Sequence, residues 1–162
     1  LPIMAYSLSK TYTLYGTRCG AMICIAKTKE IADEFKRVCE YSSRGSWSNS
    51  AKVAQVILSR IYGEPGLLER VDKERAHYRE MLIKRGRAFE EEAKKVGLKI
   101  VPFDAGFFIS IPCSDPDAIS AKLEKEGVFI VPLAKGLRVS VASISEDKCR
   151  KLPAIIKAAM EE

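Results

Sequence analysis

The chain has 162 residues, 47% of them hydrophobic and 30% charged, which suits one globular domain or a small domain plus part of another and excludes intrinsic disorder. Lysine and arginine outnumber aspartate and glutamate by 27 to 21, a balance that favours an anionic partner such as nucleic acid, a phosphate-bearing cofactor or a carboxylate substrate. No apolar run approaches the roughly 20 residues of a membrane-spanning helix, and no basic tract with interleaved aromatic residues is present, so we expect neither a membrane nor a nucleic-acid partner.

The first part of the chain alternates short apolar runs with helical patterns. An apolar run before a loop rich in threonine, tyrosine and glycine predicts a strand, and a second apolar run follows that loop. Thr28 is a suitable N-cap for a helix that we expect to end before a polar loop. The expected elements are strands at 3–7 and 20–26, helices at 29–41 and 51–62, and loops at 10–20, 42–50 and 63–66.

The second part begins with the longest predicted helix, residues 67–96, which Gly97 should end. After it the pattern becomes α+β. Strands are expected at 98–103, 106–111, 128–132 and 137–141, and helices at 116–126 and from Ser145 to the end, with a kink or restart at Pro153.

This change of pattern predicts the domain organisation. Residues 1–64 are expected to be the end of a larger α/β domain, and residues 65–162 a small α+β domain that includes the long helix. The chain starts at Leu1 and not at methionine, in the middle of strand-like sequence. We therefore expect it to be part of a longer protein.

The cysteines favour a reducing compartment. The five cysteines are odd in number, none forms a Cys-x-x-Cys pair, and with the lone His77 they make no zinc pattern. The sequence therefore predicts free thiols, no metal and a cytoplasmic location.

The most informative segment runs from Ser7 to Gly20, with the sequence Ser-Leu-Ser-Lys-Thr-Tyr-Thr-Leu-Tyr-Gly-Thr-Arg-Cys-Gly. The amine of Lys10 can bind an aldehyde cofactor covalently when burial and positive neighbours favour its neutral form. Hydroxyl groups from Ser7 and Ser9 and the guanidinium of Arg18 can bind a phosphate.

This segment resembles the active-site lysine motif of class I aminotransferases, the fold-type I enzymes that use pyridoxal phosphate, and in particular the aspartate and aromatic amino-acid group. The resemblance implies that Lys10 binds the cofactor covalently. It further implies that Ser7 and Arg18 bind the cofactor phosphate and that Ser9 supports that site. The chain would then be the C-terminal part of such an enzyme, with the tail of the large domain and the whole small domain.

Two further segments resemble the same family. Residues 136–140 resemble the strand whose arginine binds the substrate α-carboxylate, which would make Arg138 that residue. Residues 43–49 resemble the loop in which dicarboxylate-using members carry an arginine for the distal carboxylate, a role that would fall to Arg44 in a homodimer. Residues 104–108 resemble the start of the strand that lines the substrate pocket.

The resemblance implies transfer of an amino group between an amino acid, aspartate or glutamate first, and a 2-oxo acid. An aromatic or broad-specificity aminotransferase is an alternative, and so is an inactive C-terminal fragment with only a structural or dimerisation role. Because the family's upstream residues are not in this sequence, we expect the isolated chain to be weakly active or inactive.

Overall fold

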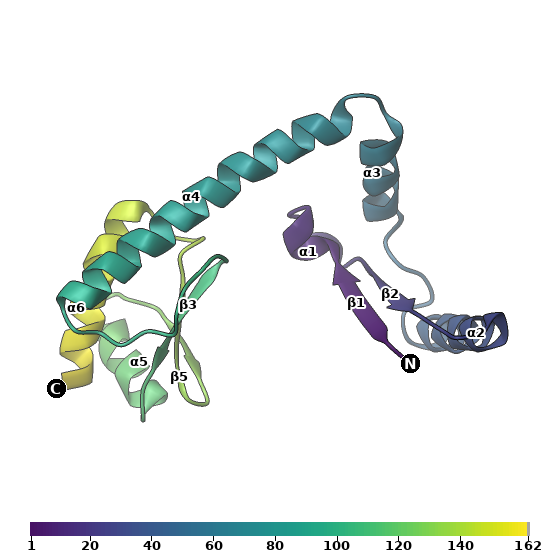
Figure 1. Ribbon diagram of the computed structural model, residues 1–162. Coiled ribbons are helices and arrows are strands. Elements are labelled where there is room, and N and C mark those ends of the chain that lie inside the picture. The colour runs from purple at the N-terminus through teal and green to yellow at the C-terminus, as the bar shows by residue number, and fades with distance from the viewer. Residues whose placement is uncertain (162) are drawn as a thin grey trace. The chain divides into compact units, whose positions relative to one another are not determined.

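The computed structural model describes residues 1–161, which form two compact units. The first unit is Leu1–Arg75 and the second begins at Ala76. The boundary falls within the long helix α4, Leu67–Lys95, so this helix contributes its first turns to one unit and the rest to the other (Figure 1). Both units mix helices with antiparallel strands, which confirms the expected mixed architecture.

The first unit is built on a pair of antiparallel strands, β1 and β2, in which Ile3 pairs with Cys24 and Ser7 with Gly20. The connection between the strands is more ordered than the expected loop, because it contains a short α-helix and a 3-10 turn. The elements of this unit before α4 are β1 (Ile3–Ser7), α1 (Leu8–Thr11), η1 (Tyr15–Thr17), β2 (Gly20–Cys24), α2 (Lys29–Ser46) and α3 (Lys52–Gly63).

Helix α2 is longer than its sequence predicts. It continues through the polar residues that we expected to form a loop and ends at Ser46. The backbone N–H groups of Trp47 and Ser48 both donate to the Ser43 carbonyl, at 2.9 and 3.0 Å, and Ser48 has a left-handed φ of 67°. This hydrogen-bonded end satisfies the Ser43 carbonyl and uses a left-handed serine where glycine is usual, so the sequence carries no glycine stop signal there.

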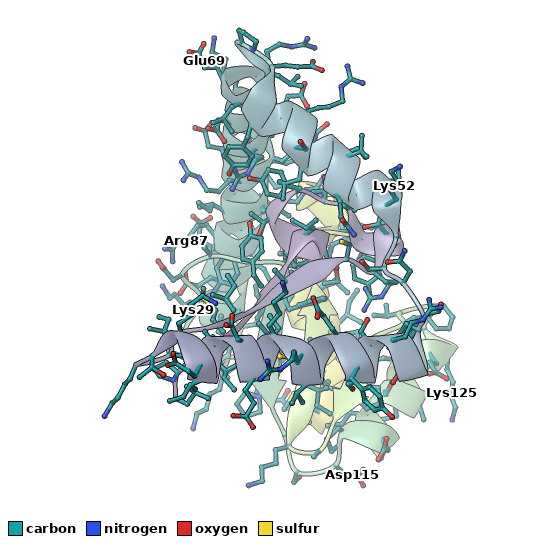
Figure 2. The ribbon with its side chains drawn as sticks, turned by 90° about the vertical axis from the view of Figure 1, so that its right-hand side faces the viewer. Lys29, Lys52, Glu69, Arg87, Asp115 and Lys125 are labelled. Atoms are coloured by element: carbon teal, nitrogen blue, oxygen red, sulfur yellow. The ribbon has the colours of Figure 1, made fainter. Side chains whose placement is uncertain are left out.

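The second unit packs helices against a three-stranded antiparallel sheet with the order β3-β5-β4. Asp115 accepts a hydrogen bond from the N–H of Ala118 and so begins α5, and Lys125 ends it (Figure 2). The elements are β3 (Phe108–Pro112), α5 (Pro116–Lys125), β4 (Val131–Leu133), β5 (Gly136–Ser140) and α6 (Glu146–Glu161).

One continuous hydrophobic core holds this unit together. It takes alternate residues from β3 and β5 and the inward faces of α4, α5 and α6. Members with almost no exposed surface are Phe89, Ile109, Ile111, Leu123, Leu137, Val141, Cys149 and Ile156.

The strand expected at residues 98–103 does not form. Of this segment, Val101 donates one backbone hydrogen bond, to the Ser110 carbonyl at 2.9 Å, and Pro102 has no N–H to donate. Phe103 anchors the segment instead, because its ring lies against Gly86 of α4 where any side chain would overlap it. Leu98 and Phe103 are buried in the core without joining the sheet, whereas Val101 is 48% exposed.

Of the kink or restart expected at Pro153, the restart is wrong, because α6 runs without a break from Glu146 to Glu161. Pro153 has no N–H and removes one helical hydrogen bond. Its ring is fully buried in the core, and this packing offsets the lost hydrogen bond.

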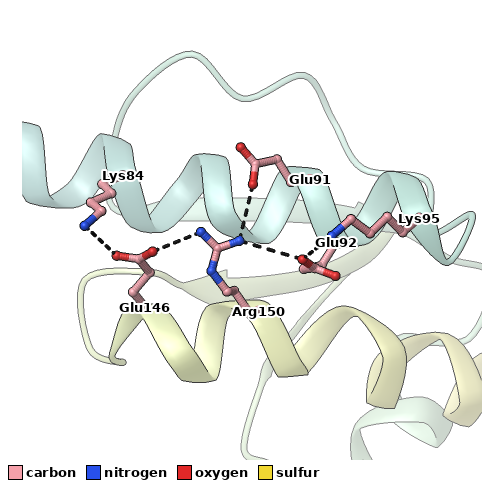
Figure 3. Close-up of polar contacts among 6 residues, drawn as sticks. All are labelled: Lys84, Glu91, Glu92, Lys95, Glu146 and Arg150. Atoms are coloured by element: carbon pink, nitrogen blue, oxygen red, sulfur yellow. Dashed lines mark hydrogen bonds and ion pairs between the residues drawn. The ribbon is translucent and has the colours of Figure 1, made fainter.

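Charged side chains join α6 to α4 at the surface of the second unit (Figure 3). Glu146 pairs with Lys84 at 3.2 Å and with Arg150 at 3.0 Å, and Arg150 also reaches Glu91 at 3.3 Å and Glu92 at 3.7 Å. Hydrogen bonds from Arg150 and Lys84 hold the pKa of Glu146 below its ordinary value. The start of α6 is thereby tied to α4 by a shared network.

Candidate functional site

The first candidate site is the loop between β1 and β2. The strands end at the facing pair Ser7 and Gly20, so the loop leaves and rejoins the ladder at the same place. The N–H of Leu8 donates to the Cys19 carbonyl at 3.1 Å, which closes the base of the loop. A side chain at Gly20 would overlap the Tyr6 carbonyl oxygen, so this close approach of the strands requires glycine.

The two serines of the motif lie at the beginning of α1. The side-chain oxygen of Ser7 accepts a hydrogen bond from the N–H of Ser9 at 3.2 Å, which is an N-cap contact. The hydroxyl of Thr11 donates to the Ser7 carbonyl at 3.3 Å. Because a hydroxyl can accept and donate at once, the Ser7 hydroxyl can still donate to an anion while it caps the helix.

Lys10 and Arg18 come together on the ring of Tyr15. The Nζ atom of Lys10 lies 4.5 Å from the ring centroid, and the Cζ atom of Arg18 lies 5.3 Å from it. Arg18 also donates from Nη1 to the Tyr15 carbonyl at 3.2 Å. All three residues are exposed. Two positive charges beside one aromatic ring make this part of the loop suitable for an anion.

The inner side of the loop is held by Tyr12. This residue is buried in an apolar cluster with Ile61 of α3, and its hydroxyl lies 2.6 Å from the hydroxyl of Tyr62. The hydrogen bond and burial together raise the pKa of Tyr12 to about 12. The guanidinium of Arg75, in the first part of α4, lies 5.3 Å from the Tyr12 ring centroid. The lysine loop is therefore attached to two helices of its own unit.

The second candidate site is Arg138 on β5. In the ladder Arg138 pairs with Ser110, and the Cζ atom of Arg138 lies 4.5 Å from the ring centroid of Phe108. The alternating neighbours Leu137 and Val139 enter the core, so Arg138 lies on the other face of the sheet. Its Nε atom is buried and has no hydrogen-bond partner among residues 1–161. A buried donor without a partner is costly, and a bound carboxylate would satisfy it.

Arg44 lies in the last turn of α2 and not in a loop. Its Nη1 atom donates to the side-chain oxygen of Ser48 at 2.7 Å and to the Ser48 carbonyl at 3.4 Å. Arg44 is exposed and thus accessible to an anion.

The structure gathers four of the expected residues in one loop, namely Ser7, Ser9, Lys10 and Arg18. Arg44 lies elsewhere in the first unit, and Arg138 belongs to the second. No sequence pattern pointed to Tyr62, because its contact with Tyr12 spans 50 residues. Tyr15 was visible as part of the motif, five residues after Lys10 and three before Arg18, although its contact with both cations was not.

Neither a metal site nor a membrane span is found among residues 1–161. No three histidine, cysteine, aspartate or glutamate residues there are placed to share a metal ion. None of the described helices combines the length and the apolar character that crossing a bilayer needs.

Comparison with known proteins assigns the chain to a family. The family model described as "Aminotransferase class I and II" matches residues 2–156. The chain is 28% identical, over 146 residues, to the aromatic amino acid aminotransferase of Cutibacterium acnes (strain DSM 16379 / KPA171202). The match covers 90% of this chain and 37% of that protein.

Solved structures agree with this assignment. An aminotransferase from Anaerococcus prevotii DSM 20548 superposes with a TM-score of 0.92 and 34% identity, covering 100% of this chain and 41% of that one. The aromatic-amino-acid aminotransferase from Burkholderia pseudomallei, described as covalently bound to pyridoxal phosphate, has the same fold with a TM-score of 0.74 and 22% identity, over 98% of this chain and 40% of its own. The chain spans about two fifths of the length of these relatives, and it belongs to the class I and II aminotransferase family.

Proposed function

We propose that the enzyme containing this chain is a pyridoxal-phosphate-dependent aminotransferase, which moves an amino group between an amino acid and a 2-oxo acid. The observation that carries the proposal is the placement of Lys10 and Arg18 on one ring, in the loop that also holds Ser7 and Ser9. Family membership supports the same conclusion.

The residues of this loop fit the cofactor. Lys10 supplies an amine for its aldehyde carbon, and Arg18 supplies a planar group of donors for its phosphate. The hydroxyls of Ser7 and Ser9 complete the set of phosphate donors. Bound pyridoxal phosphate supplies an aldehyde carbon that receives the amino group and a ring that accepts electrons from the substrate.

The chain's own residues then perform two tasks. The Nζ atom of Lys10, once released, takes the proton from the substrate Cα and delivers it again as general base and acid. Arg138 binds the substrate α-carboxylate through its fork of N–H groups and so orients the Cα–H bond. The buried Nε atom of Arg138 and its position over the Phe108 ring support this assignment.

For the substrate we propose aspartate or glutamate, with Arg44 binding the distal carboxylate across a homodimer. The exposure of the Arg44 guanidinium supports this role. An aromatic substrate is the second candidate, because the relative from Cutibacterium acnes is named an aromatic amino acid aminotransferase. With aspartate and phenylalanine as substrates, Arg44→Ala should lower only aspartate turnover by the complete enzyme. Unchanged aspartate turnover would contradict the dicarboxylate assignment.

The free thiols support a cytoplasmic location, since all five cysteines are unpaired. A purely structural or dimerisation role for the chain is the remaining alternative, and a test of covalent cofactor binding separates it from the enzyme proposal.

That test is reductive trapping on the chain itself. Residues 1–162 are incubated with pyridoxal phosphate, reduced with borohydride and analysed by peptide mass. Lys10→Ala should abolish the main adduct, whereas Lys52→Ala, at an exposed lysine of the same unit, should leave it unchanged. Adducts spread over many lysines in all three proteins would contradict a selective site and favour the structural role.

A further inference from the structure

Tyr15 contacts both charged groups of the proposed cofactor loop. Its ring lies 4.5 Å from Lys10 Nζ and 5.3 Å from Arg18 Cζ, and its carbonyl accepts from Arg18 Nη1 at 3.2 Å. The face of an aromatic ring attracts cations, because its electron density there is high. Tyr15 thus holds an amine and a guanidinium that are separated by eight positions in the sequence.

The backbone around Tyr15 is fastened, so its ring is not merely a mobile surface group. Tyr15 begins the 3-10 turn η1, and Thr17 closes that turn with two hydrogen bonds to the Leu14 carbonyl, at 3.3 Å from its N–H and 2.7 Å from its hydroxyl. Leu14 packs against the apolar cluster of the first unit, and Arg18 follows in a left-handed conformation with φ 48°. Lys10 precedes Tyr15 in the sequence and Arg18 follows it.

We propose that Tyr15 is a positioning residue, which sets the Lys10 amine and the Arg18 guanidinium at a spacing that one pyridoxal phosphate molecule can bridge. This inference rests on the proposed function and adds to it a group that touches neither aldehyde nor phosphate. The aromatic ring carries the effect, and the hydroxyl is not required, since both cations are placed relative to the ring.

The measurable sign of this role is stronger labelling of Lys10 by pyridoxal phosphate than by pyridoxal. We call the ratio of the two the phosphate advantage. Pyridoxal and pyridoxal phosphate present the same aldehyde group once the cyclic hemiacetal of pyridoxal has opened, a constant factor that all variants share, and only pyridoxal phosphate carries a phosphate that can bind Arg18. The ratio of Lys10 labelling by the two compounds therefore measures how well the amine and the guanidinium act together. Any change in the intrinsic reactivity of the amine affects both compounds and cancels in the ratio.

The experiment uses the 162-residue chain and measures Lys10 labelling by each compound at equal concentration. The Lys10 nitrogen forms a bond to the aldehyde carbon, the aldehyde oxygen leaves as water, and borohydride then adds hydride to that carbon to give a stable amine. The variants are Tyr15→Leu, Tyr15→Phe, Arg18→Ala and the control Tyr41→Leu, whose residue is 84% exposed on α2.

We expect the wild-type chain, Tyr15→Phe and Tyr41→Leu to share one phosphate advantage. Tyr15→Leu should lower it by about 2- to 5-fold, the size of one exposed cation–π contact, and Arg18→Ala should reduce it to the ratio that free lysine gives. Tyr15 is 61% exposed, so the leucine variant should keep the fold, which its circular dichroism checks.

A second measurement uses no cofactor. The ring should shift the NMR signals of the Lys10 ε-methylene protons upfield in the wild-type chain and in Tyr15→Phe, and Tyr15→Leu should return them to the free-lysine position. Unshifted signals in the folded wild-type chain would overturn the inference without any variant.

The outcomes separate the two proposals. A wild-type chain that labels Lys10 selectively, with a phosphate advantage that Tyr15→Leu leaves intact, overturns the role of Tyr15 and keeps the proposed function. A wild-type chain without selectivity for Lys10 overturns the proposed cofactor site, and the role of Tyr15 falls with it.

Discussion

The hydroxyl groups of Tyr12 and Tyr62 form a hydrogen bond behind the lysine loop, and its removal should lower the stability of the protein. Tyr62→Phe should lower the free energy of unfolding by about 1 kcal/mol, the usual net value of one hydrogen bond. The pKa of Tyr12 should fall from about 12 toward its ordinary value, because the hydrogen bond to Tyr62 is the largest cause of the shift. Ultraviolet titration of tyrosine ionisation and denaturant unfolding measure the two effects.

The sign of the pH dependence follows from the direction of this shift. A tyrosine whose pKa is raised on folding contributes its full stabilisation at pH values below its pKa in the unfolded chain, which is near 10. This contribution is lost as the pH rises through the folded pKa of about 12. The stability difference between wild type and Tyr62→Phe should therefore shrink over that range. Tyr41→Phe is the control, and a difference that stays constant up to pH 12 would contradict the assignment.

Arg138 should tolerate no conservative replacement. Lysine keeps the charge but lacks the planar fork, so Arg138→Lys should lower kcat/KM of the complete enzyme by about 10- to 100-fold, the value of one charged hydrogen bond. The same replacement at the surface arginine Arg79 should have no effect. Equal kcat/KM for Arg138→Lys and wild type would show that bidentate binding by this residue is not used.

At the level of elements, the contact between Gly86 and Phe103 makes α4 sensitive to a single methyl group. Alanine favours a helix over glycine by about 1 kcal/mol, yet here its Cβ would overlap the Phe103 ring. Moving a buried ring in a packed core costs about 1–3 kcal/mol, so Gly86→Ala should destabilise the second unit. Thermal unfolding tests this, with Gly63→Ala, where a Cβ meets nothing within 4 Å, as the control.

The network between α4 and α6 should respond to acid. A carboxyl whose pKa is lowered on folding contributes stability above its unfolded value and loses it as the pH falls through the folded one. Glu146→Gln should be less stable than wild type at pH 7, and this difference should shrink as the pH falls toward 3. Denaturant midpoints at both pH values measure this, beside a Glu124→Gln control, and a penalty of the same size at pH 3 would contradict it.

The sequence predicted elements well wherever local signals were strong. Helices at 51–62 and 67–96 correspond to Lys52–Gly63 and Leu67–Lys95, because their apolar periodicity and stop residues are local. The end of α2 depends on Ser48 in a left-handed conformation, and the missing strand before β3 depends on the packing of Phe103 against Gly86, 17 residues earlier, as well as on Pro102. Of these, only Pro102 is a local signal in the sequence.

At the level of the molecule, the family and the lysine loop could be predicted because the motif is contiguous. The partners of the loop could not, since Tyr62 and Arg75 lie 50 and 63 residues after Tyr12 in the sequence. The division of the chain into a large-domain tail, residues 1–64, and a small domain, residues 65–162, stays a prediction. The roles of Ser7, Ser9, Lys10, Arg18, Arg44 and Arg138 are likewise proposals.

Each of the two cores contains one buried thiol, Cys19 in the first unit and Cys149 in the second. Cys19 also lies inside the lysine loop, where its carbonyl closes the base. The two cysteines are thus natural probes of local opening, because the rate at which a thiol reagent modifies each of them reports how often its core opens. If both become reactive at the same denaturant concentration, the units open as one. If Cys19 reacts first, the lysine loop opens more readily than the second core. A phosphate ester bound to the loop should then stabilise its closed form.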